Sequence, residues 1–401
     1  MVEKVAAVAA LVALLAIALV PNCISMTRKI SYQPSGAVII CGWNEGPDIT
    51  DFWVDSYFAY WMMRNYYNLS SDQVAYLAPM MTPDIDFPPN AITGLSTKEN
   101  VQYYLGQWLR QYRNDVFVYV ASHGGGWNNA TQLLEGGRND TSGDEGNEYY
   151  VNGSWINVDE GIYLKNGNTM YWDDEMRENL SWTLSSPVCY STIMLQNCYN
   201  EEYSNLTCFS GGFIDDLSSM YARTILTSSN ETGLSYGRCE WDTRSNPFSP
   251  FTYRFFTSIL GYEVDWDGLN GIAIDYLHPI DWSYKSLRGA YEYVLQHDGA
   301  HLAGKEFPWI DDDGDRLPNF ENNNETLDFP CNATTELMRW LQCDVNYDGK
   351  VNMMDIAIVA VAFRATPSSA KWNKQADIRG EDWKIDMRDI ASVANSFGKT
   401  T

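Results

Sequence analysis

Continuous apolar segments, separated by longer amphipathic ones, constrain the fold of this chain more than any other feature. These segments are GAVIICGWN (36–44), QVAYLAP (73–79), DVFVYVAS (115–122), CYSTIMLQN (189–197) and RTILTSS (223–229). Short segments that are apolar throughout are typical of strands buried on both faces of a sheet. Helical apolar spacing lies between or after them, at 50–68, 97–114, 173–184 and 248–261. The sequence therefore predicts an α/β fold whose mostly parallel sheet carries functional residues at its carboxyl ends.

Length and charge restrict the classes of protein that this chain can represent. Its 401 residues are enough for a sizeable core and an additional small domain. A formal net charge of −25 excludes a nucleic-acid partner, because phosphate binding needs clustered Lys and Arg. The same acidity suits calcium binding and attraction of cationic substrates.

The first residues predict export. Lys4 precedes an unbroken apolar run from Ala6 to Val20, which is short for a membrane span and fits a signal peptide over residues 1–25. An uncleaved membrane anchor is the alternative. Glycosylation sequons support a secreted or cell-surface location. They lie at Asn68, Asn129, Asn139, Asn152, Asn179, Asn205, Asn230, Asn324 and Asn332.

The cysteines leave one thiol without a partner within the chain. The sequence has eight, and cleavage of the signal peptide removes Cys23, so an odd number remains. Exported proteins oxidise most of their cysteines to disulfides. Cys208 with Cys239 is one plausible pair, and Cys331 with Cys343 is another. Cys41 and Cys189 lie in predicted strands and are expected to be buried thiols or a further pair.

The last sixty residues contain a duplicated unit. Segments 348–363 and 382–397 align without gaps. The first copy closes a loop of twelve residues with oxygen ligands at alternate positions, the arrangement that calcium prefers. The predicted ligands are Asp344, Asn346, Asp348, the carbonyl of Lys350, and Asp355. In the second copy only Asp382, Asp386 and Asp389 remain, so its calcium occupancy is open.

This duplicated pattern resembles the loop–helix repeats of type I dockerins. The resemblance implies a small helical calcium-binding domain at 341–401 that docks to a partner protein. The preceding segment, 306–340, contains DDDGDRLPN and resembles calcium-binding linker loops through Asp311, Asp313 and Asp315. An acidic solvated hinge is the alternative for this linker.

His123 and Cys198 each follow a predicted strand of the sheet. If the two strands are neighbours, imidazole and thiol meet at the same edge. A histidine beside a thiol favours the nucleophilic thiolate. A glycine at 124 lets the backbone approach a substrate carbonyl, and the amides of Gly124 and Cys198 then form an oxyanion hole.

The motifs SHGGG and QNCYN, in this order, resemble those of the caspase-like peptidases, with the legumain family nearest. The resemblance implies a three-layer sandwich over 30–305, with Asn44 orienting the histidine. It places Gln196, Ser235 and Tyr236 in the substrate pocket. Legumains usually have an acidic residue where this chain has Gln196. Asn, Asp or a basic residue before the scissile bond therefore all remain open.

We expect an exported cysteine endopeptidase with structural Ca²⁺ and no cofactor for catalysis. Its partners would be a protein or peptide substrate and a docking partner for the C-terminal repeat. A catalytically inactive surface protein and a transpeptidase are the alternatives. His297 and His301 have the spacing of a helical zinc pair, but Gly299 weakens that helix and no third ligand is evident.

Overall fold

The chain forms two compact units, with residues 34–340 in one and 341–401 in the other. The computed structural model describes residues 35–42, 50–67, 69–81, 91–112, 115–128, 133–135, 138–139, 149–151, 154–156, 158–165, 169–184, 190–197, 210–217, 223–230, 235–236, 248–264, 280, 287–311, 343, 345, 351–366, 369, 371, 376 and 384–398. The predicted signal peptide lies outside these residues. Among the described helices, none combines the length and the apolar character needed to cross a membrane.

A seven-stranded sheet forms the centre of the larger unit, in the order β15-β14-β13-β4-β1-β2-β3. Its strands are β1 (Gly36–Cys41), β2 (Val74–Ala78), β3 (Gly94–Leu95), β4 (Asp115–Ser122), β13 (Tyr190–Asn197), β14 (Arg223–Thr227) and β15 (Trp309–Asp311). Neighbouring strands are parallel except at the edge, where β15 runs antiparallel to β14. The predicted mostly parallel sheet is confirmed. The edge strand β15 was not predicted, because it is short and opens the acidic segment assigned to the linker.

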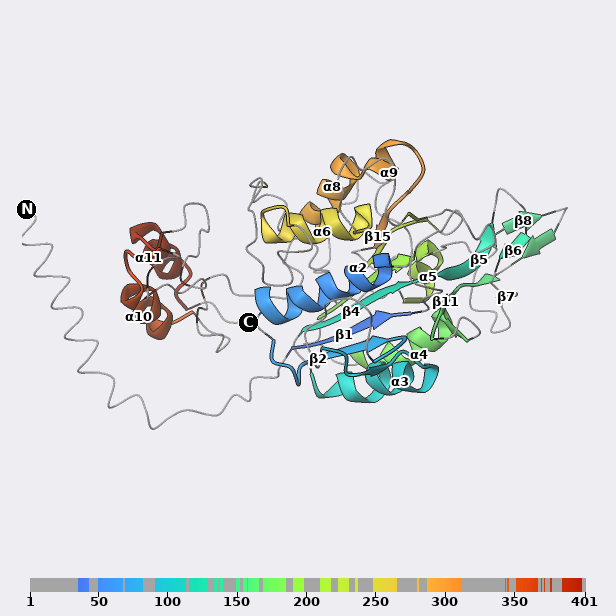
Figure 1. Ribbon diagram of the computed structural model, residues 1–401, viewed down its shortest axis with the longest axis horizontal. Helices are drawn as coiled ribbons and strands as arrows, with labels where there is room; N and C mark the ends of the chain where they lie inside the picture. Colours follow the sequence, from blue (N-terminus) through green and yellow to red (C-terminus); the bar gives the residue numbers. More distant parts are fainter. Residues whose placement is uncertain are drawn as a thin grey trace, which may run out of the picture. The chain divides into compact units, whose positions relative to one another are not determined.

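Helices cover both faces of this sheet (Figure 1). The helices of one face are α2 (Thr50–Trp61), α6 (Pro250–Leu260) and α8 (Leu287–His297), and those of the other are α3 (Lys98–Tyr103), α4 (Asp173–Leu184) and α5 (Phe213–Leu217). Successive strand residues point to opposite faces. Ile39 and Tyr119 therefore pack with the first set of helices, and Val38 and Val120 pack with the second.

The first and second predicted helices end differently from a regular α-helix. Helix α2 continues as a π-helical turn (Met62–Tyr66), and α3 continues through a π-helical turn (Tyr104–Trp108) into a 3-10 turn (Leu109–Gln111). Buried Met62, Met63 and Leu105 keep these turns against the sheet. Packing of these residues against the sheet therefore continues both helices past their regular α-helical parts, close to the ends that the apolar spacing predicts.

A second small sheet continues from the end of β4. It has the order β12-β11-β5-β6, from β5 (Gly124–Asn128), β6 (Leu133–Glu135), β11 (Gly161–Tyr163) and β12 (Met170–Trp172). Two further strand pairs are β7 (Arg138–Asn139) with β10 (Val158–Asp159), and β8 (Tyr149–Val151) with β9 (Ser154–Ile156). The sequence of this region reads as a polar insertion, because its strands are too short to show an apolar period.

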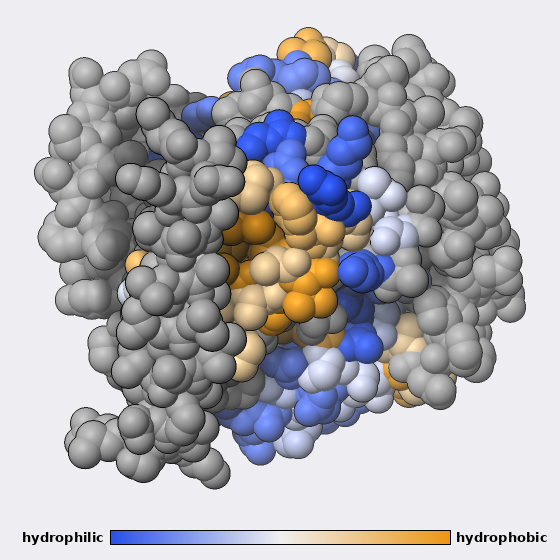
Figure 2. Space-filling model, turned by 90° about the vertical axis from the view of Figure 1, so that its left-hand side faces the viewer, coloured by the Kyte–Doolittle hydropathy of each residue, from blue (hydrophilic) through white to orange (hydrophobic). Residues whose placement is uncertain are grey.

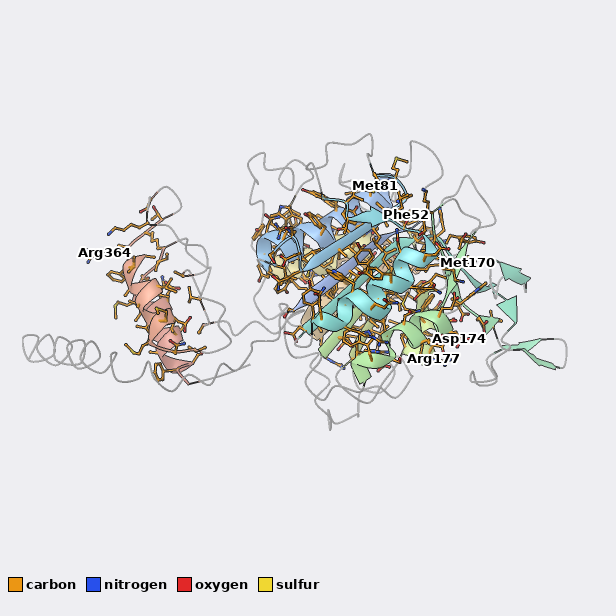
Figure 3. The ribbon with its side chains drawn as sticks, turned by 90° about the horizontal axis from the view of Figure 1, so that it is seen from below. Phe52, Met81, Met170, Asp174, Arg177 and Arg364 are labelled. Carbon is orange, nitrogen blue, oxygen red and sulfur yellow. The ribbon has the colours of Figure 1, made fainter. Side chains whose placement is uncertain are left out.

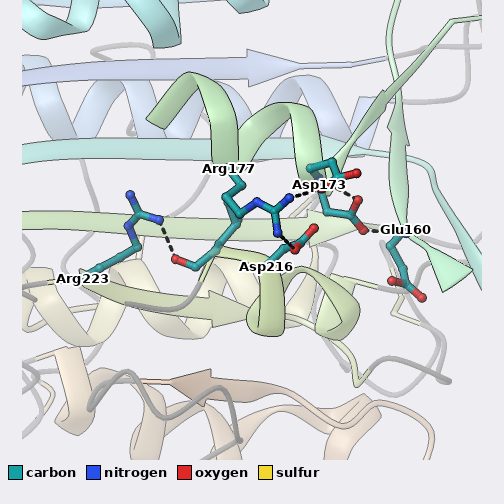
Figure 4. A network of polar contacts seen from close by, with 7 residues as sticks. Glu160, Asp173, Arg177, Asp216 and Arg223 are labelled. Carbon is teal, nitrogen blue, oxygen red and sulfur yellow. Dashed lines mark hydrogen bonds and ion pairs between the residues drawn. The ribbon is translucent and has the colours of Figure 1, made fainter. Parts of the chain in front are cut away.

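Polar contacts attach α4 to its surroundings (Figure 4). The Arg177 guanidinium forms ion pairs with carboxylates of two helices. Its Nη1 lies 2.7 Å from Asp216 Oδ1 on α5, and its Nη2 pairs with Asp174 on α4. The Asp173 carboxylate accepts a 2.6 Å hydrogen bond from the backbone N–H of Glu160, next to β11. Asp174 and Arg177 lie together on the same helix in Figure 3. These contacts hold the small sheet and α5 to one helix.

The C-terminal unit contains α10 (Met353–Val361) and α11 (Met387–Asn395), at equivalent places in the two repeats. Asn352 and Asp386 are the N-caps, and each helix has a capping box. The core also follows the repeat, because Val351 and Val359 are matched by Ile385 and Val393. Backbone hydrogen bonds join the repeats, from Gly398 N to Val351 O (2.8 Å) and from Arg364 N to Ile385 O (2.7 Å). The duplication predicted from sequence is therefore one folded unit.

Candidate active site

His123 lies at the junction of the two sheets, directly after β4 and directly before β5. Its side chain is buried, and its ring meets the Phe52 ring edge to face, with centroids 4.9 Å apart. Phe52 comes from α2 (Figure 3). The predicted position at the carboxyl end of a strand is confirmed, and α2 limits the ring to a narrow range of orientations.

The register between β4 and β13 fixes what lies beside His123. Ser122 pairs with Asn197, and the two strands run parallel. Cys198 follows Asn197 directly in the sequence but lies outside the described residues. Residues 123 and 198 therefore directly follow, in the sequence, two paired residues of adjacent parallel strands.

Gly124 begins β5 opposite Ile162 of β11. The Tyr163 N–H donates to the His123 carbonyl oxygen at 2.9 Å, so residues 163 and 123 form a hydrogen-bonded pair. Antiparallel ladders alternate such pairs with non-hydrogen-bonded ones. The Gly124 N–H therefore points away from β11, which leaves it outside that ladder.

The end of β1 approaches the same edge. Gly42 N donates to Ala121 O at 2.8 Å, and a Cβ at this position would meet Ser122 Oγ at 2.0 Å and Tyr163 O at 2.5 Å. Only glycine allows this approach. Asn44, the predicted partner of the histidine, lies outside the described residues.

Cys41 is the buried thiol that the sequence predicts. It points into the core on the α2 side of β1, and it forms no disulfide. Burial raises the pKa of this thiol far above its ordinary value, and the hydrogen bond with Ser56 offsets only part of that. A thiol held protonated in this way is a poor nucleophile. The described structure therefore argues against Cys41 as the reactive cysteine.

The three predicted pocket residues are brought together by a buried hydrogen-bond network. Gln196 Nε2 donates to Ser235 Oγ at 3.1 Å, and Ser235 Oγ donates to Glu306 Oε1 at 2.5 Å. The Tyr236 N–H also donates to Glu306 Oε1, at 3.4 Å. Gln196, Ser235 and Glu306 are all fully buried.

Sequence analysis missed Glu306, which it placed at the start of the linker. No motif surrounds this residue in EFPWI, so the sequence offered only an isolated acidic residue before an apolar segment. Its contact with Ser235 joins residues 71 positions apart. The antiparallel strand β15, which begins three residues later, fixes this segment beside β14.

A second buried carboxyl group accompanies Glu306. Asp298 caps the short helix α9 (Gly299–Leu302), accepting from Ala300 N at 2.8 Å and His301 N at 3.1 Å. Burial raises the pKa of Asp298 to about 6, although these backbone donors lower it. Burial also raises the pKa of Glu306 well above its ordinary value, and the charge of Asp298 adds to the effect.

The histidine pair does not form a zinc site on a continuous helix. Asp298 separates α8 from α9, so His297 and His301 lie on different helices. The Nδ1 of His297 is 3.0 Å from Tyr293 O, and that of His301 is 2.9 Å from Glu306 O. Among the described residues, no group of three or more His, Cys, Asp or Glu side chains is arranged to hold a metal.

In the C-terminal unit, the last predicted ligand of each loop is buried at the start of a helix. Asp355 accepts from Val345 N and from Asn352 N, both at 2.7 Å, and therefore ties the two ends of the first loop together. Asp389 accepts from Asp386 N at 2.7 Å in the second copy. Asp386 is the exposed cap of α11 and pairs with the Arg388 guanidinium at 2.8 Å.

The other predicted ligands of the loops lie outside the described residues; they are Asp344, Asn346, Asp348, Lys350 and Asp382. Lys384, equivalent to Lys350, directly precedes the buried Ile385. Of the linker ligands, Asp311 is buried at the end of β15, opposite Ile225, whereas Asp313 and Asp315 lie outside the described residues. The buried carboxylates of Asp355 and Asp389, each at a loop end, fit the hard oxygen donors that calcium requires.

Comparison with known proteins identifies this unit. The family model described as dockerin type I domain matches residues 342–398. Residues 342–398 are a dockerin type I domain. Dockerin type I domains bind calcium, which agrees with the predicted structural Ca²⁺. No curated protein matches the chain.

One solved structure, protein GSU0716 from Geobacter sulfurreducens, is only remotely similar to this chain. The TM-score is 0.36 and the sequence identity is 12%, over 69% of this chain and 92% of that chain. A similarity at this level supports no statement about activity. The dockerin domain is thus the part of the chain whose family is shown, and the function of the larger unit is argued from its geometry.

Proposed function

We propose that the larger unit is a cysteine endopeptidase with Cys198 as nucleophile and His123 as general base and acid. The parallel pairing of Ser122 with Asn197 carries this proposal, because it makes residues 123 and 198 the next residues of adjacent strands. The sheet with helices on both faces and one antiparallel edge strand also supports a caspase-like architecture, with legumains as the nearest family. Functional residues of parallel α/β sheets gather at this edge.

In the proposed reaction, the Cys198 thiolate attacks the carbonyl carbon of the scissile peptide bond after His123 takes the thiol proton. The Gly124 and Cys198 N–H groups stabilise the oxyanion of the tetrahedral intermediate. His123 then protonates the leaving amine, and a thioester forms as the peptide bond breaks. Water deprotonated by His123 releases the acid and regenerates the thiol. Asn44 holds the imidazole in the required orientation.

A thiol-reactive peptide probe tests this function. We expect the wild type to be labelled, and Cys198→Ala and His123→Ala to lose labelling and peptide cleavage. Cys41→Ala is the matched control, since Cys41 is a buried thiol whose raised pKa makes it unreactive. Equal labelling of wild type and Cys198→Ala, or labelling lost in Cys41→Ala, would overturn the assignment.

A transpeptidase uses the same thioester but transfers the acyl group to an amine instead of water. Adding a peptide with a free amino terminus distinguishes the two, because a transpeptidase forms a ligated product that mass spectrometry detects. A catalytically inactive surface protein would show neither reaction while still binding peptides. The strand register that places residues 123 and 198 directly after paired residues of adjacent strands favours an active enzyme over this alternative.

For the C-terminal unit, we propose docking to a partner through the dockerin domain, with calcium as a structural ion. Dockerin domains bind cohesin partners and occur in extracellular cellulosome components. Figure 2 shows one face of the molecule, on which an apolar area is bordered by hydrophilic side chains. Exposed apolar residues of this unit are Met353, Met354, Val361, Met387 and Phe397.

Calorimetry with a type I cohesin tests the docking proposal. Binding should require calcium, and Met353→Asp combined with Met387→Asp should weaken it, because these two exposed side chains occupy equivalent places in the repeats. Leu302→Asp, on an exposed residue of the larger unit, is the control and should bind as the wild type does. Together with the predicted signal peptide, a dockerin partner supports a location of the proposed enzyme outside the cell.

A further inference from the structure

A buried acidic group lies beside the proposed substrate pocket. Glu306 is fully buried, and its Oε2 accepts no hydrogen bond from any described residue. Its Oε1 accepts from Ser235 Oγ and from Tyr236 N. A buried carboxyl oxygen without a donor is unfavourable unless a further donor reaches it.

Hydrogen bonds connect this carboxyl group to the strand that leads to the nucleophile. Gln196 is on β13, two residues before Cys198, and its amide is 3.1 Å from Ser235 Oγ. Glu306 is the next group in the same chain of hydrogen bonds, 2.5 Å from Ser235 Oγ. The resemblance to legumains places an acidic side chain at residue 196, where this protein has a neutral amide. The network brings Glu306 from another segment to the neighbourhood of that missing acid.

The charges around Glu306 are predominantly acidic. Asp298 and Asp55 both raise the pKa of Glu306, which adds to the effect of burial. Arg254, on α6, lowers the pKa of Asp298, and its guanidinium pairs with Glu263 at 3.2 Å. The His301 Nδ1 lies 2.9 Å from the backbone carbonyl oxygen of Glu306, so this hydrogen bond does not involve the Glu306 carboxyl group. Among the described residues, the charges that act on Glu306 thus come from two carboxyl groups, and Oε2 receives no hydrogen bond from a cationic donor.

We propose that Glu306 is the acidic residue of the substrate pocket, and that the peptidase prefers arginine or lysine before the scissile bond. This inference rests on the proposed function. A guanidinium or ammonium group would donate to Oε2 and supply the positive charge that the acidic surroundings lack. An apolar or acidic side chain would bury this carboxyl group without a partner, which a polar site disfavours strongly. Ser235 positions Glu306 from one side, and Gln196 holds Ser235.

The wild-type protein provides the first test, independent of any variant's folding. One peptide sequence is prepared with Arg, Lys, Asn, Asp or Leu before the scissile bond, and kcat/KM is measured for each. We expect the Arg and Lys peptides to be cleaved at least about 100-fold more efficiently than the others. Cleavage preferentially after Asn, Asp or Leu would overturn the proposal while leaving the peptidase function intact. Absence of cleavage of every peptide would instead count against the peptidase function.

Glu306→Gln provides the second test, since the amide keeps the shape of the side chain and removes its charge. We expect kcat/KM for the Arg and Lys peptides to fall at least about 30-fold, with a much smaller change for the Asn peptide. Glu175→Gln is the control, because Glu175 pairs with Lys98 at 2.6 Å on the opposite side of the sheet. Unchanged selectivity in Glu306→Gln, with a melting curve like that of the control, would overturn the proposal.

Peptide binding by an inactive variant tests recognition of the substrate side chain separately from catalysis. The Cys198→Ala protein keeps the pocket but lacks the nucleophile, so fluorescence anisotropy with labelled peptides measures recognition alone. The Arg peptide should bind more tightly than the Leu peptide, and adding Glu306→Gln should remove this difference. Equal affinities in the Cys198→Ala protein would show that Glu306 does not recognise the side chain.

Discussion

Asn197 lies opposite Ser122 in the parallel pairing of β13 with β4. This pair is the last rung before the chain leaves each strand, so the next residues are Cys198 and His123. A slip of one residue would turn every side chain of a strand to the other face. Because both strands are buried on both faces, packing fixes the register between them.

Gly42→Ala should disturb the site through the backbone. The added Cβ would lie 2.0 Å from Ser122 Oγ and 2.5 Å from Tyr163 O, and a backbone oxygen does not move away easily. We expect the free energy of unfolding to fall by about 2–4 kcal/mol and probe labelling at Cys198 to decrease. Urea denaturation and labelling measure the two effects.

Gly94→Ala is the matched control for Gly42→Ala. Its Cβ would find its nearest neighbours at 3.6 Å, which is ordinary contact. Labelling should stay at the wild-type level in this variant. If Gly42→Ala is as stable and as reactive as Gly94→Ala, then the close approach of β1 to Ser122 has no part in forming the site.

Arg223→Leu should destabilise the larger unit strongly. Arg223 is buried at the start of β14, and its guanidinium donates to Thr183 Oγ1 at 2.6 Å, Leu180 O at 3.1 Å and Leu217 O at 2.5 Å. Leucine removes the guanidinium donors, and although Leu180 O keeps the Thr183 hydroxyl as a donor at 2.8 Å, the buried groups lose three hydrogen bonds, so we expect a loss of about 3–5 kcal/mol in urea denaturation. The loss of stability in Arg223→Lys should lie between zero and that of Arg223→Leu, since one ammonium group cannot replace the planar, forked guanidinium. A loss below about 1 kcal/mol for leucine would contradict this account.

Asp298 should make stability depend on pH in a defined direction. Its folded pKa, about 6, is above the ordinary value of 3.8, so the folded state binds more protons than the unfolded state between those values. The contribution of Asp298 to the free energy of unfolding is therefore fully present below about pH 4 and is lost as pH rises through about 6. His301 and Arg254 lower this pKa, and Glu306 is coupled to Asp298 through its charge.

The difference between wild type and Asp298→Asn isolates this effect. The asparagine keeps an oxygen for the Ala300 and His301 N–H groups. Denaturation at pH 4, 5, 6 and 7 should show the variant gaining stability relative to wild type as pH rises. A difference that is constant over this range, or that runs in the opposite direction, would show that Asp298 does not hold a raised pKa.

Asp355→Ala should remove both the calcium response and part of the stability of the dockerin domain. The change leaves the Val345 and Asn352 N–H groups without their acceptors and deletes the closing carboxylate of the first loop. Calorimetry of the full chain should show loss of calcium binding at this loop. Asp386→Ala, which removes an exposed cap, should cost only about 1 kcal/mol and leave calcium binding at the first loop unchanged. Equal calcium binding by wild type and Asp355→Ala would contradict the ligand assignment.

The sequence alone predicted the elements whose apolar pattern is strong. The strand at 115–122 and the helix at 173–184 have the predicted bounds, and the two repeats of the dockerin domain were evident from their alignment. These predictions succeed because burial on both strand faces, helical periodicity and duplication are local properties of the chain. The strands between 124 and 172 and the edge strand β15 were missed, because strands of two to five residues are too short to show an apolar period.

Sequence by itself also determined which residue types lie at strand ends, and therefore His123 as a candidate for catalysis. Only the tertiary structure decided which groups meet there. Strand order made β4 and β13 neighbours, and the antiparallel β15 brought Glu306 to Ser235, 71 positions away along the chain. Such contacts depend on how strands from distant segments pair and on which faces they bury. No local pattern in the sequence encodes that choice, because it is made by the packing of the whole sheet.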